Sequence, residues 1–354
     1  MKALRIIGIA LLTLVVAFGL ALGILTITAY NPPEKEMLTP FGGAGEDAAP
    51  YSLRILTWNL GYCGIDSETD VFIEGGTMSR ARSLDAVEDA LSGITTFLYG
   101  QDADVMFLQE VDKKAKRSFS IDQVSSLSGR FSEYQSFFAV NYKSPFVPVP
   151  LSAPMGQVLS GVMTLTRYAS QSAARFQLPG QYSWPVRIFH LKRCALITVV
   201  PSHDPDRSWY LVNIHLSAFD SGNLRTSQLE FVKEKILGMA AEGHYVVVGG
   251  DWNSLFPGVQ KDQFGAYTTP EENLDWVFRI PEGWTPEGWQ WCFDGEVPTA
   301  RSNERPYIPG ETFQTIIDGF LVSPNLSVEE VSSYNLGYLH SDHHPVAITV
   351  RPLE

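Results

Sequence analysis

Acidic, amide and imidazole side chains stand at the ends of several apolar runs in this chain. The run 245–248 leads into Asp251, and the run that begins at Pro345 is preceded by Asp342 and His343. Other apolar runs end on the same residue types or contain them, at Asn59, Glu110, His215 and Asp318. Strands that end in such residues present them at the edge of a sheet, where α/β enzymes place their chemistry.

The oxygen-bearing members of this set indicate a hard metal ion. The carboxylates of Glu110, Asp251 and Asp342 occur together with the amide oxygens of Asn59 and Asn253. Ligands of this kind suit Mg²⁺ or Mn²⁺ better than zinc. Because Mg²⁺ binds through one or two carboxylates together with substrate phosphate, the set predicts phosphoryl chemistry.

Two histidines are candidates for acid, base or anion-contacting groups. His215 and His343 both stand at strand ends. A nearby Asp fixes the tautomer of a histidine and stabilises its cation. Asp318 could play this part for His343, while Asp251 could activate a water molecule. Any one of these residues could equally be a hydrogen-bonded structural group, and their joint occurrence at strand ends is what favours a catalytic site.

Alternating strands and helices must position these residues. Apolar runs predict strands at 53–59, 104–109, 160–167, 195–200, 209–215, 245–250, 316–322 and 345–351. Helical spacing predicts helices over 80–99 with Ser79 as the cap, over 224–239 after a turn at 220–223, and more weakly over 113–127. Two long irregular stretches, 143–160 and 254–311, are typical of functional loops.

The N-terminal residues predict an uncleaved membrane anchor. Residues 6–29 are almost wholly apolar, long enough to cross a bilayer as a helix, and Lys2 and Arg5 precede them. By the positive-inside rule the N-terminus stays in the cytoplasm and the body is exported. A cleaved signal peptide is the alternative, although its apolar core would be only about 7–15 residues long. The predicted domains are an anchor at 1–30, a Pro/Gly/Ala-rich linker at 31–50 and a folded body at 51–354.

The composition limits the classes of partner that the protein can bind. Of the 354 residues, 45% are hydrophobic and 18% are charged, as in a folded protein, and the net charge is −13. Without the three bases and four acids of residues 1–50, the body keeps 23 bases and 35 acids, a net charge of −12. Such a body repels long polyanions, so nucleic acid is a disfavoured partner. The three cysteines form no Cys-x-x-Cys pair, which excludes a zinc knuckle and leaves room for at most one disulfide.

Taken together, the motifs resemble those of the endonuclease/exonuclease/phosphatase superfamily, the DNase I-like enzymes. The matching segments occur in the family's order: Thr57-Trp58-Asn59-Leu60, Leu108-Gln109-Glu110, 161–168, 212–216, Gly250-Asp251-Trp252-Asn253, Ile317-Asp318-Gly319 and 341–346. Each motif alone is a weak signal, but six or seven in register are specific. The resemblance covers residues 53–351, and it implies an α/β (α+β) four-layer sandwich. In that fold two mixed β-sheets pack face to face with helices outside, here preceded by one transmembrane helix.

The resemblance also implies roles for single residues. Glu110 would be the metal ligand, assisted by Asn59 and Asp342, and the cofactor would be Mg²⁺, or else Mn²⁺. Asp251 would orient or deprotonate the attacking water, and Asn253 would hold phosphate or a second metal. The remaining implied catalytic residues are His343 on the scissile phosphate, Asp318 behind it, and His215 on the opposite side. Water would attack in line without a covalent intermediate.

Three departures from the family's pattern count against DNA repair. Abasic-site endonucleases carry a second Asp where this chain has Gly61, and the family usually has an aromatic residue where this chain has Gly319 and an Asn where it has Val162. A repair enzyme would also gain nothing from an outward-facing anchor.

The function predicted from the sequence is an exported, membrane-anchored, Mg²⁺-dependent phosphoesterase of the bacterial cytoplasmic membrane, expected to be a monomer. Its substrate would be a phospholipid-type or small phosphate ester, and the apolar loop 146–151 could meet the bilayer. One alternative is an extracellular nuclease, with Arg301, Arg305 or the basic segment 113–117 on phosphates, although that segment reads more simply as a solvated helix face. The other is a catalytically inactive cell-surface scaffold.

Overall fold

The central strands are apolar on both faces, and each is covered on its two sides. In β3 (Leu53–Asn59), Leu53 and Ile55 pack into the core between the sheets, whereas Leu56 and Trp58 pack beneath the outer helices. Double burial explains why these strands read as continuous apolar runs. The computed structural model describes residues 1–354 apart from 49, 220–222, 266, 275 and 354.

Two seven-stranded mixed sheets form the middle of the molecule. The first has the order β1 (Lys35–Met37), β7 (Ser172–Gln177), β8 (Cys194–Pro201), β9 (Ser208–His215), β10 (Tyr245–Asp251), β14 (Asp318–Val322) and β11 (Gln290–Cys292). The second has the order β15 (Leu326–Ser333), β16 (Val346–Pro352), β3, β4 (Val105–Asp112), β6 (Gly156–Thr166), β5 (Gln135–Val147) and β2 (Phe41–Gly42). The pairs β9–β10 and β3–β4 are parallel. A separate short pair joins β12 (Ala300–Arg301) to β13 (Gln314–Thr315).

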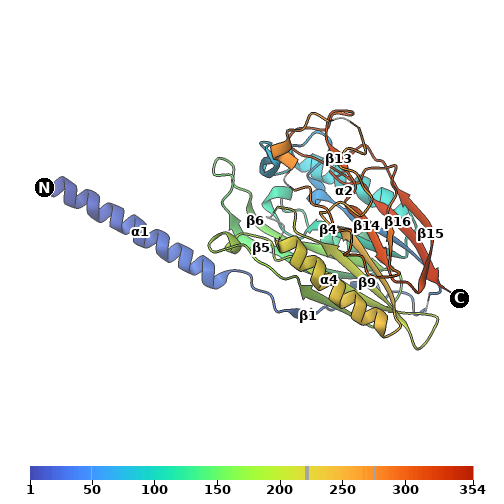
Figure 1. Ribbon diagram of the computed structural model, residues 1–354. Helices are drawn as coiled ribbons and strands as arrows, with labels where there is room; N and C mark the ends of the chain where they lie inside the picture. Colours follow the sequence, from blue (N-terminus) through green and yellow to red (C-terminus); the bar gives the residue numbers. More distant parts are fainter. Residues whose placement is uncertain (49, 220–222, 266, 275, 354) are drawn as a thin grey trace.

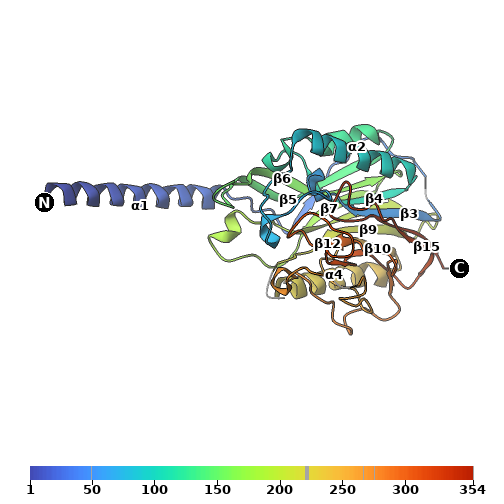
Figure 2. The same cartoon turned by 90° about the horizontal axis from the view of Figure 1, so that it is seen from above.

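Helices cover the outer faces of both sheets, which confirms the four-layer sandwich. Figure 2 shows α2 (Leu84–Gly100) on one side of the sheets and α4 (Asn223–Ala241) on the other. Val87 and Ile94 of α2 pack on the second sheet together with α3 (Gln123–Arg130), and Val232 and Ile236 of α4 pack on the first. Burial of these apolar faces is the main stabilising term of the fold.

Most predicted elements are confirmed, with differences at the helices. Helix α2 begins at Leu84 and is capped by Ser83, whose hydroxyl accepts a hydrogen bond from the Ala86 amide at 3.0 Å, so the predicted cap at Ser79 is wrong. The predicted helix 113–127 is also wrong, because β4 runs to Asp112 and α3 begins only at Gln123, after a short 3₁₀ turn. Of the predicted turn 220–223, residues 220–222 lie outside the described residues.

Two stretches without a clear strand pattern in the sequence nevertheless contribute strands to the sheets. Residues 35–37 and 41–42, inside the predicted linker, pair with β7 and β5 and so extend both sheets. Residues 143–160, predicted to be irregular, are mostly a hairpin of β5 and β6. The prolines and glycines in these stretches obscure the strand pattern in the sequence, because these residues are typical of turns and are tolerated in strands mainly at edges.

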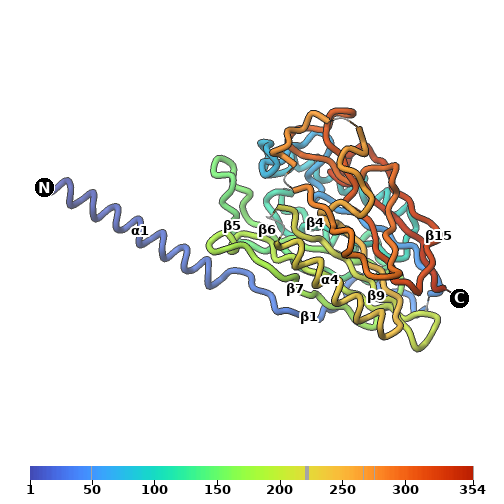
Figure 3. The backbone as a smooth tube through the Cα atoms, in the orientation of Figure 1, coloured from blue at the N-terminus to red at the C-terminus, as the bar shows by residue number. Residues whose placement is uncertain are grey.

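The N-terminal helix α1 (Lys2–Thr28) projects from the body (Figures 1 and 3). None of its residues is buried, and its length and composition would allow it to cross a membrane. The three cysteines are buried, and none of them forms a disulfide bond.

Candidate active site

Five strands bring their polar residues to one end of the two sheets. Cross-strand register places Asp251 directly between His215 on β9 and Asp318 on β14. Gly250 permits this approach, because a Cβ there would lie 2.0 Å from the Ile214 carbonyl oxygen and its φ is +143°. In the second sheet, Asn59 is paired with Gln109 of β4. The predicted convergence of strand ends is therefore present.

A hydrogen bond between the two sheets holds these ends together. The Gln109 side-chain amide donates to Asn213 of β9 at 2.8 Å and to the Thr57 hydroxyl at 3.1 Å. Asn213 in turn donates to the Met163 carbonyl at 2.9 Å. All four residues are fully buried, so each polar group finds its partner inside the protein.

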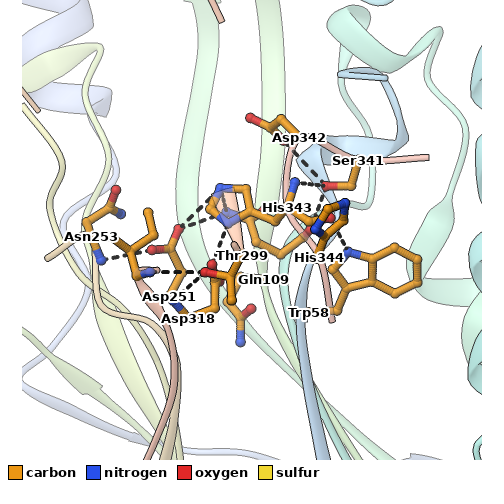
Figure 4. Close-up of polar contacts among 12 residues, drawn as sticks. Trp58, Gln109, Asp251, Asn253, Thr299, Asp318, Ser341, Asp342, His343 and His344 are labelled. Atoms are coloured by element: carbon orange, nitrogen blue, oxygen red, sulfur yellow. Dashed lines mark hydrogen bonds and ion pairs between the residues drawn. The ribbon is translucent and has the colours of Figure 1, made fainter. Parts of the chain in front are cut away.

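The carboxylate of Asp251 is the centre of the site (Figure 4). Its Oδ2 accepts a hydrogen bond from Asn59 Nδ2 at 2.9 Å and lies 3.2 Å from His215 Nε2, while its Oδ1 accepts from the Asn253 amide at 2.8 Å. Burial, and next the charge of Asp318, raise the pKa of Asp251 to about 6, against the opposing charge of His343. Burial, with Arg193 adding to it, holds the pKa of His215 well below its ordinary value, so His215 is neutral.

His343 is oriented by Asp318. Its Nδ1 lies 2.8 Å from Asp318 Oδ2, and its Nε2 points towards Asp251 Oδ2 at 3.9 Å. Burial acts to lower the pKa of His343, but the charge of Asp318 and the hydrogen bond to it raise that pKa well above its ordinary value. A buried cation is thus held between two carboxylates, the environment that stabilises an imidazolium.

Backbone contacts fix the loop that carries His343. Trp58 Nε1 donates to the His343 carbonyl at 2.9 Å, and the Ser341 hydroxyl donates to the Asn59 carbonyl at 2.7 Å. On the other side, the Thr299 hydroxyl accepts from the amides of Ile317 and Asp318, both at 3.0 Å. These contacts fix the backbone that carries His343 and the start of the strand that carries Asp318, its imidazole partner.

A second group of carboxylates faces the same pocket. Glu110 sits at a bulge of β4 with a φ of +52°, and Asp342 accepts a hydrogen bond from Asn303 Nδ2 at 2.9 Å. Burial raises the pKa of Glu110, with Arg117 opposing and Asp342 adding to the shift. Glu74 joins them, because it accepts from the amide and the side chain of Asn303 at 2.8 and 3.0 Å, and burial raises its pKa to about 7.

These oxygen donors fit a divalent cation. The charge of Asp342 adds to the raised pKa of the buried Glu110 carboxyl, and a bound cation would offset that repulsion. The Asn303 side-chain oxygen is buried without a hydrogen-bond partner. Asp251, Asp318 and His343 also lie close enough to hold a metal. In that cluster Asp318 Oδ2 is taken by His343 and Asp251 is hydrogen-bonded through both oxygens, and only Asp318 Oδ1 lacks a partner among the described residues, so we take the Glu110 and Asp342 side as the better metal candidate.

The residues that sequence reasoning missed are Glu74 and Arg193. Arg193 lines the pocket, and its Nη1 is buried without a hydrogen-bond partner. Burial lowers its pKa, while the charges of Glu110 and Asp251 act to raise it. A signal existed for Arg193, because this residue directly precedes β8. Since β8 is antiparallel to β9, the start of β8 lies at the end of the sheet where β9 ends. No pattern marked Glu74, which comes from a 3₁₀ turn.

Two arginines that were candidates for phosphate contacts make their hydrogen bonds within the protein. Arg301 donates to the carbonyl oxygens of Asp66 and Thr69 at 2.6 and 3.0 Å. Arg117 is buried rather than on a solvated helix face, and it pairs with Asp112 at 3.0 Å and stacks on Tyr62. Lys113, Lys114 and Lys116 are exposed, as the simpler reading predicted.

The family model for the endonuclease/exonuclease/phosphatase family matches residues 56–343, which spans every strand that carries a site residue. The chain belongs to this family. Family members are metal-dependent hydrolases that act on phosphoester bonds, so the protein is a hydrolase of this kind.

Solved structures support the fold. An endonuclease/exonuclease/phosphatase protein from Beutenbergia cavernae is similar, with a TM-score of 0.56 and 19% identity over 85% of this chain and 72% of that one. Truncated TDP2 from Caenorhabditis elegans gives a TM-score of 0.52 and 17% identity over 86% and 100%. The human Nocturnin catalytic domain, solved with a bound sulfate, gives 0.52 and 15% over 92% and 100%. No curated protein sequence matches the chain.

Proposed function

We propose that this family member is an exported, membrane-anchored, Mg²⁺-dependent phosphoesterase that cleaves its substrate by in-line attack of water. The observation that carries the proposal is the row His215, Asp251 and Asp318, with the buried His343 cation beside it. A carboxylate whose pKa is raised, next to a cation at a pocket floor, is the arrangement that activates water and receives a negative phosphate.

Glu110, Asn59 and Asp342 would hold the Mg²⁺ ion, with Mn²⁺ as a substitute and Glu74 as a further carboxylate. When bound, the ion neutralises the charge that develops on the phosphate oxygens. Gly61 suits this set, because a Cβ at that position would lie 2.7 Å from Asp342 Oδ1 and crowd it. Abasic-site endonucleases carry their second Asp at the position of Gly61. In this chain Glu74, which comes from a different segment, would supply the carboxylate beside Asp342.

The chain's own side chains would activate the water and bind the phosphate. Asp251 orients the attacking water and accepts its proton, and neutral His215 holds Asp251 Oδ2 in place. Asn253 Nδ2 donates to the Leu216 carbonyl at 2.8 Å, which leaves its second proton for a phosphate oxygen. The His343 cation contacts the scissile phosphate from the far side, and Arg193 adds a second cation whose Nη1 has no protein partner.

The apolar helix α1 supports the proposed location of the enzyme. Lys2 and Arg5 precede the apolar segment, which favours a cytoplasmic N-terminus and an extracytoplasmic catalytic domain. We take the enzyme to be a bacterial membrane-anchored monomer. A phospholipid-type or small phosphate ester fits the acidic body better than long nucleic acid, because Arg301 and Arg117 make their hydrogen bonds within the protein. The inactive-scaffold alternative is less favoured, since the side chains of Asp251, Asn253, Asp318 and His343 are all held by hydrogen bonds at one end of the sheets.

The test is hydrolysis of bis-p-nitrophenyl phosphate and p-nitrophenyl phosphate by the full chain in detergent micelles. We expect turnover with Mg²⁺ that EDTA abolishes and that His343→Ala lowers by about 10²-fold or more. His340→Ala, which alters a neighbouring histidine that does not line the pocket, is the matched control and should keep full activity. Turnover that persists in EDTA or in His343→Ala would refute the proposal.

A further inference from the structure

The pocket above the catalytic residues has a polar floor and an apolar wall. The floor contains Glu110, Asp251 and His343, and the wall is built by the segments 71–78, 147–155 and 186–191. The pocket encloses about 350 Å³, enough for a small ligand or part of a larger one. A substrate that fills it must therefore carry its phosphate at one end and apolar groups next to it.

The apolar wall continues onto the surface. Ile73, Val149 and Val186 all line the pocket, yet they are 50%, 45% and 48% exposed. Beside them, Leu151 is 87% exposed and Trp184 is 52% exposed. Single exposed apolar residues need no explanation, but a rim that surrounds a pocket mouth marks a surface that meets apolar material.

The anchor reaches this same rim. Trp184 Nε1 donates to the Thr26 hydroxyl of α1 at 3.1 Å, and the Tyr30 hydroxyl donates to the Val140 carbonyl of β5 at 3.3 Å. In both cartoon views the β5–β6 hairpin and the segment around 185 lie at the end of the body where α1 joins it, and the C-terminus lies at the other end (Figures 1 and 2). If α1 spans a bilayer, the rim lies at its surface, where Trp is enriched.

Charge distinguishes this part of the chain as well. Residues 134–203 contain no Asp or Glu and six bases, in a protein with 39 acidic and 26 basic residues. Of these bases, Lys143 and Arg187 are exposed on the two segments that touch the anchor. Basic residues at a membrane surface are attracted to anionic lipid, whereas the acidic remainder of the body is repelled from it.

We propose that the pocket mouth rests on the bilayer and that the enzyme takes a membrane phospholipid directly from it. The phosphate would reach the polar floor, the first apolar groups of the lipid would lie against the wall, and the remaining chains would stay in the bilayer. This inference rests on the proposed phosphoesterase function and names its substrate class.

The position of the mouth is tested without using activity. Leu151→Cys and, as the matched control at the opposite end, Leu353→Cys would be labelled with an environment-sensitive fluorophore, since the three native cysteines are buried. The full chain would then be reconstituted in vesicles of phosphatidylcholine and phosphatidylglycerol. We expect brominated phospholipids to quench the label at 151 and not at 353. A label at 151 that stays in water, or that is shielded without quenching, would overturn the inference.

Substrate choice is tested by rim variants. Leu151→Glu and Trp184→Glu, which alter exposed rim residues outside the pocket lining, with Leu353→Glu as control, would be assayed on vesicle phospholipid and on bis-p-nitrophenyl phosphate. Each rim variant should lose about tenfold or more on vesicle lipid and stay within about twofold on the soluble ester. Equal loss on both substrates, or no loss on lipid, would contradict the inference.

The two proposals fail in different ways. An enzyme that hydrolyses only the soluble ester, with the label at 151 in water, would keep the phosphoesterase function and remove the membrane substrate. A chain with no metal-dependent turnover of any ester would remove the phosphoesterase function and with it the lipid as substrate, while quenching at 151 would still report where the mouth lies.

Discussion

The floor and the mouth of the pocket are built on opposite principles. On the floor, polar side chains from strand ends are buried, and hydrogen bonds such as Asn59 to Asp251 and Gln109 to Asn213 hold them in place. At the mouth, apolar side chains from loops, such as Val149 and Leu151, are exposed. The difference separates a floor built from the strands that the family fold provides from a mouth built by loops, where we expect substrate choice to be made.

The comparison predicts its largest effect at the centre of the floor. Asp251→Asn removes the charge and the base while keeping the shape, so kcat should fall by about 10²–10⁴-fold on lipid and soluble ester alike. Stopped assays on both substrates would measure this, and circular dichroism would check that the variant is folded. If Asp251→Asn lost activity on only one of the two substrates, the floor would not be the common catalytic site and the division of roles between floor and mouth would be wrong.

The next effect comes from removing the metal. EDTA should abolish hydrolysis, Mg²⁺ should restore it, and Glu110→Gln should raise the Mg²⁺ concentration for half-maximal rate by about 10–100-fold. Metal titrations on the soluble ester give this number without involving the mouth. An unchanged Mg²⁺ requirement in Glu110→Gln would place the metal elsewhere, for instance on Asp251, Asp318 and His343.

A smaller loss is expected at Arg193, which the account places on the phosphate. Arg193→Gln should lower kcat/KM by about 10–100-fold, the value of a charge-assisted hydrogen bond, and Arg193→Lys should recover part of it. Sulfate inhibition provides a second readout, because the inhibition constant should rise in the same order. Equal activity of all three proteins would show that this buried cation has only a structural part.

The smallest effect concerns stability and separates the two regions most simply. Leu151→Ser should change the free energy of unfolding by no more than about 0.5 kcal/mol, because the side chain packs on nothing in the body. Ile214→Ala, beside the floor and fully buried, should cost about 2–5 kcal/mol. Urea unfolding in a mild detergent measures both. A large loss in Leu151→Ser would mean that the hairpin tip packs against the protein.

Sequence reasoning succeeded where local pattern and tertiary position coincide. A strand buried on both faces must read as an apolar run, and a polar residue that ends it must lie at the sheet edge, so Asn59 and Asp251 could be placed, whereas Asp318 was expected inside its strand and in fact begins β14. It failed where position depends on distant partners. Arg193 enters the site because β8 pairs antiparallel with β9, which can be read only once that pairing is known, and Glu74 enters through a loop contact to Asn303 that leaves no local signature.

The edge strands and the mouth illustrate the same limit. Residues 35–42 have the composition of a linker, yet 35–37 and 41–42 form strands by pairing with the edges of β7 and β5. The proline-rich hairpin tip was noticed as an apolar loop, but its place beside the pocket and the anchor depends on the whole fold.

The central claim is that one metal-dependent floor acts on a substrate that the mouth takes from a membrane. Its most direct test is hydrolysis by the full chain in vesicles, with Mg²⁺ or EDTA and with Asp251→Asn. The panel would contain phosphatidyl lipids, sphingomyelin, inositol phosphates, bis-p-nitrophenyl phosphate, plasmid DNA and RNA. The account predicts EDTA-sensitive hydrolysis of a vesicle lipid at a higher kcat/KM than any soluble substrate, lost in Asp251→Asn. Preferential cleavage of DNA or RNA would contradict it.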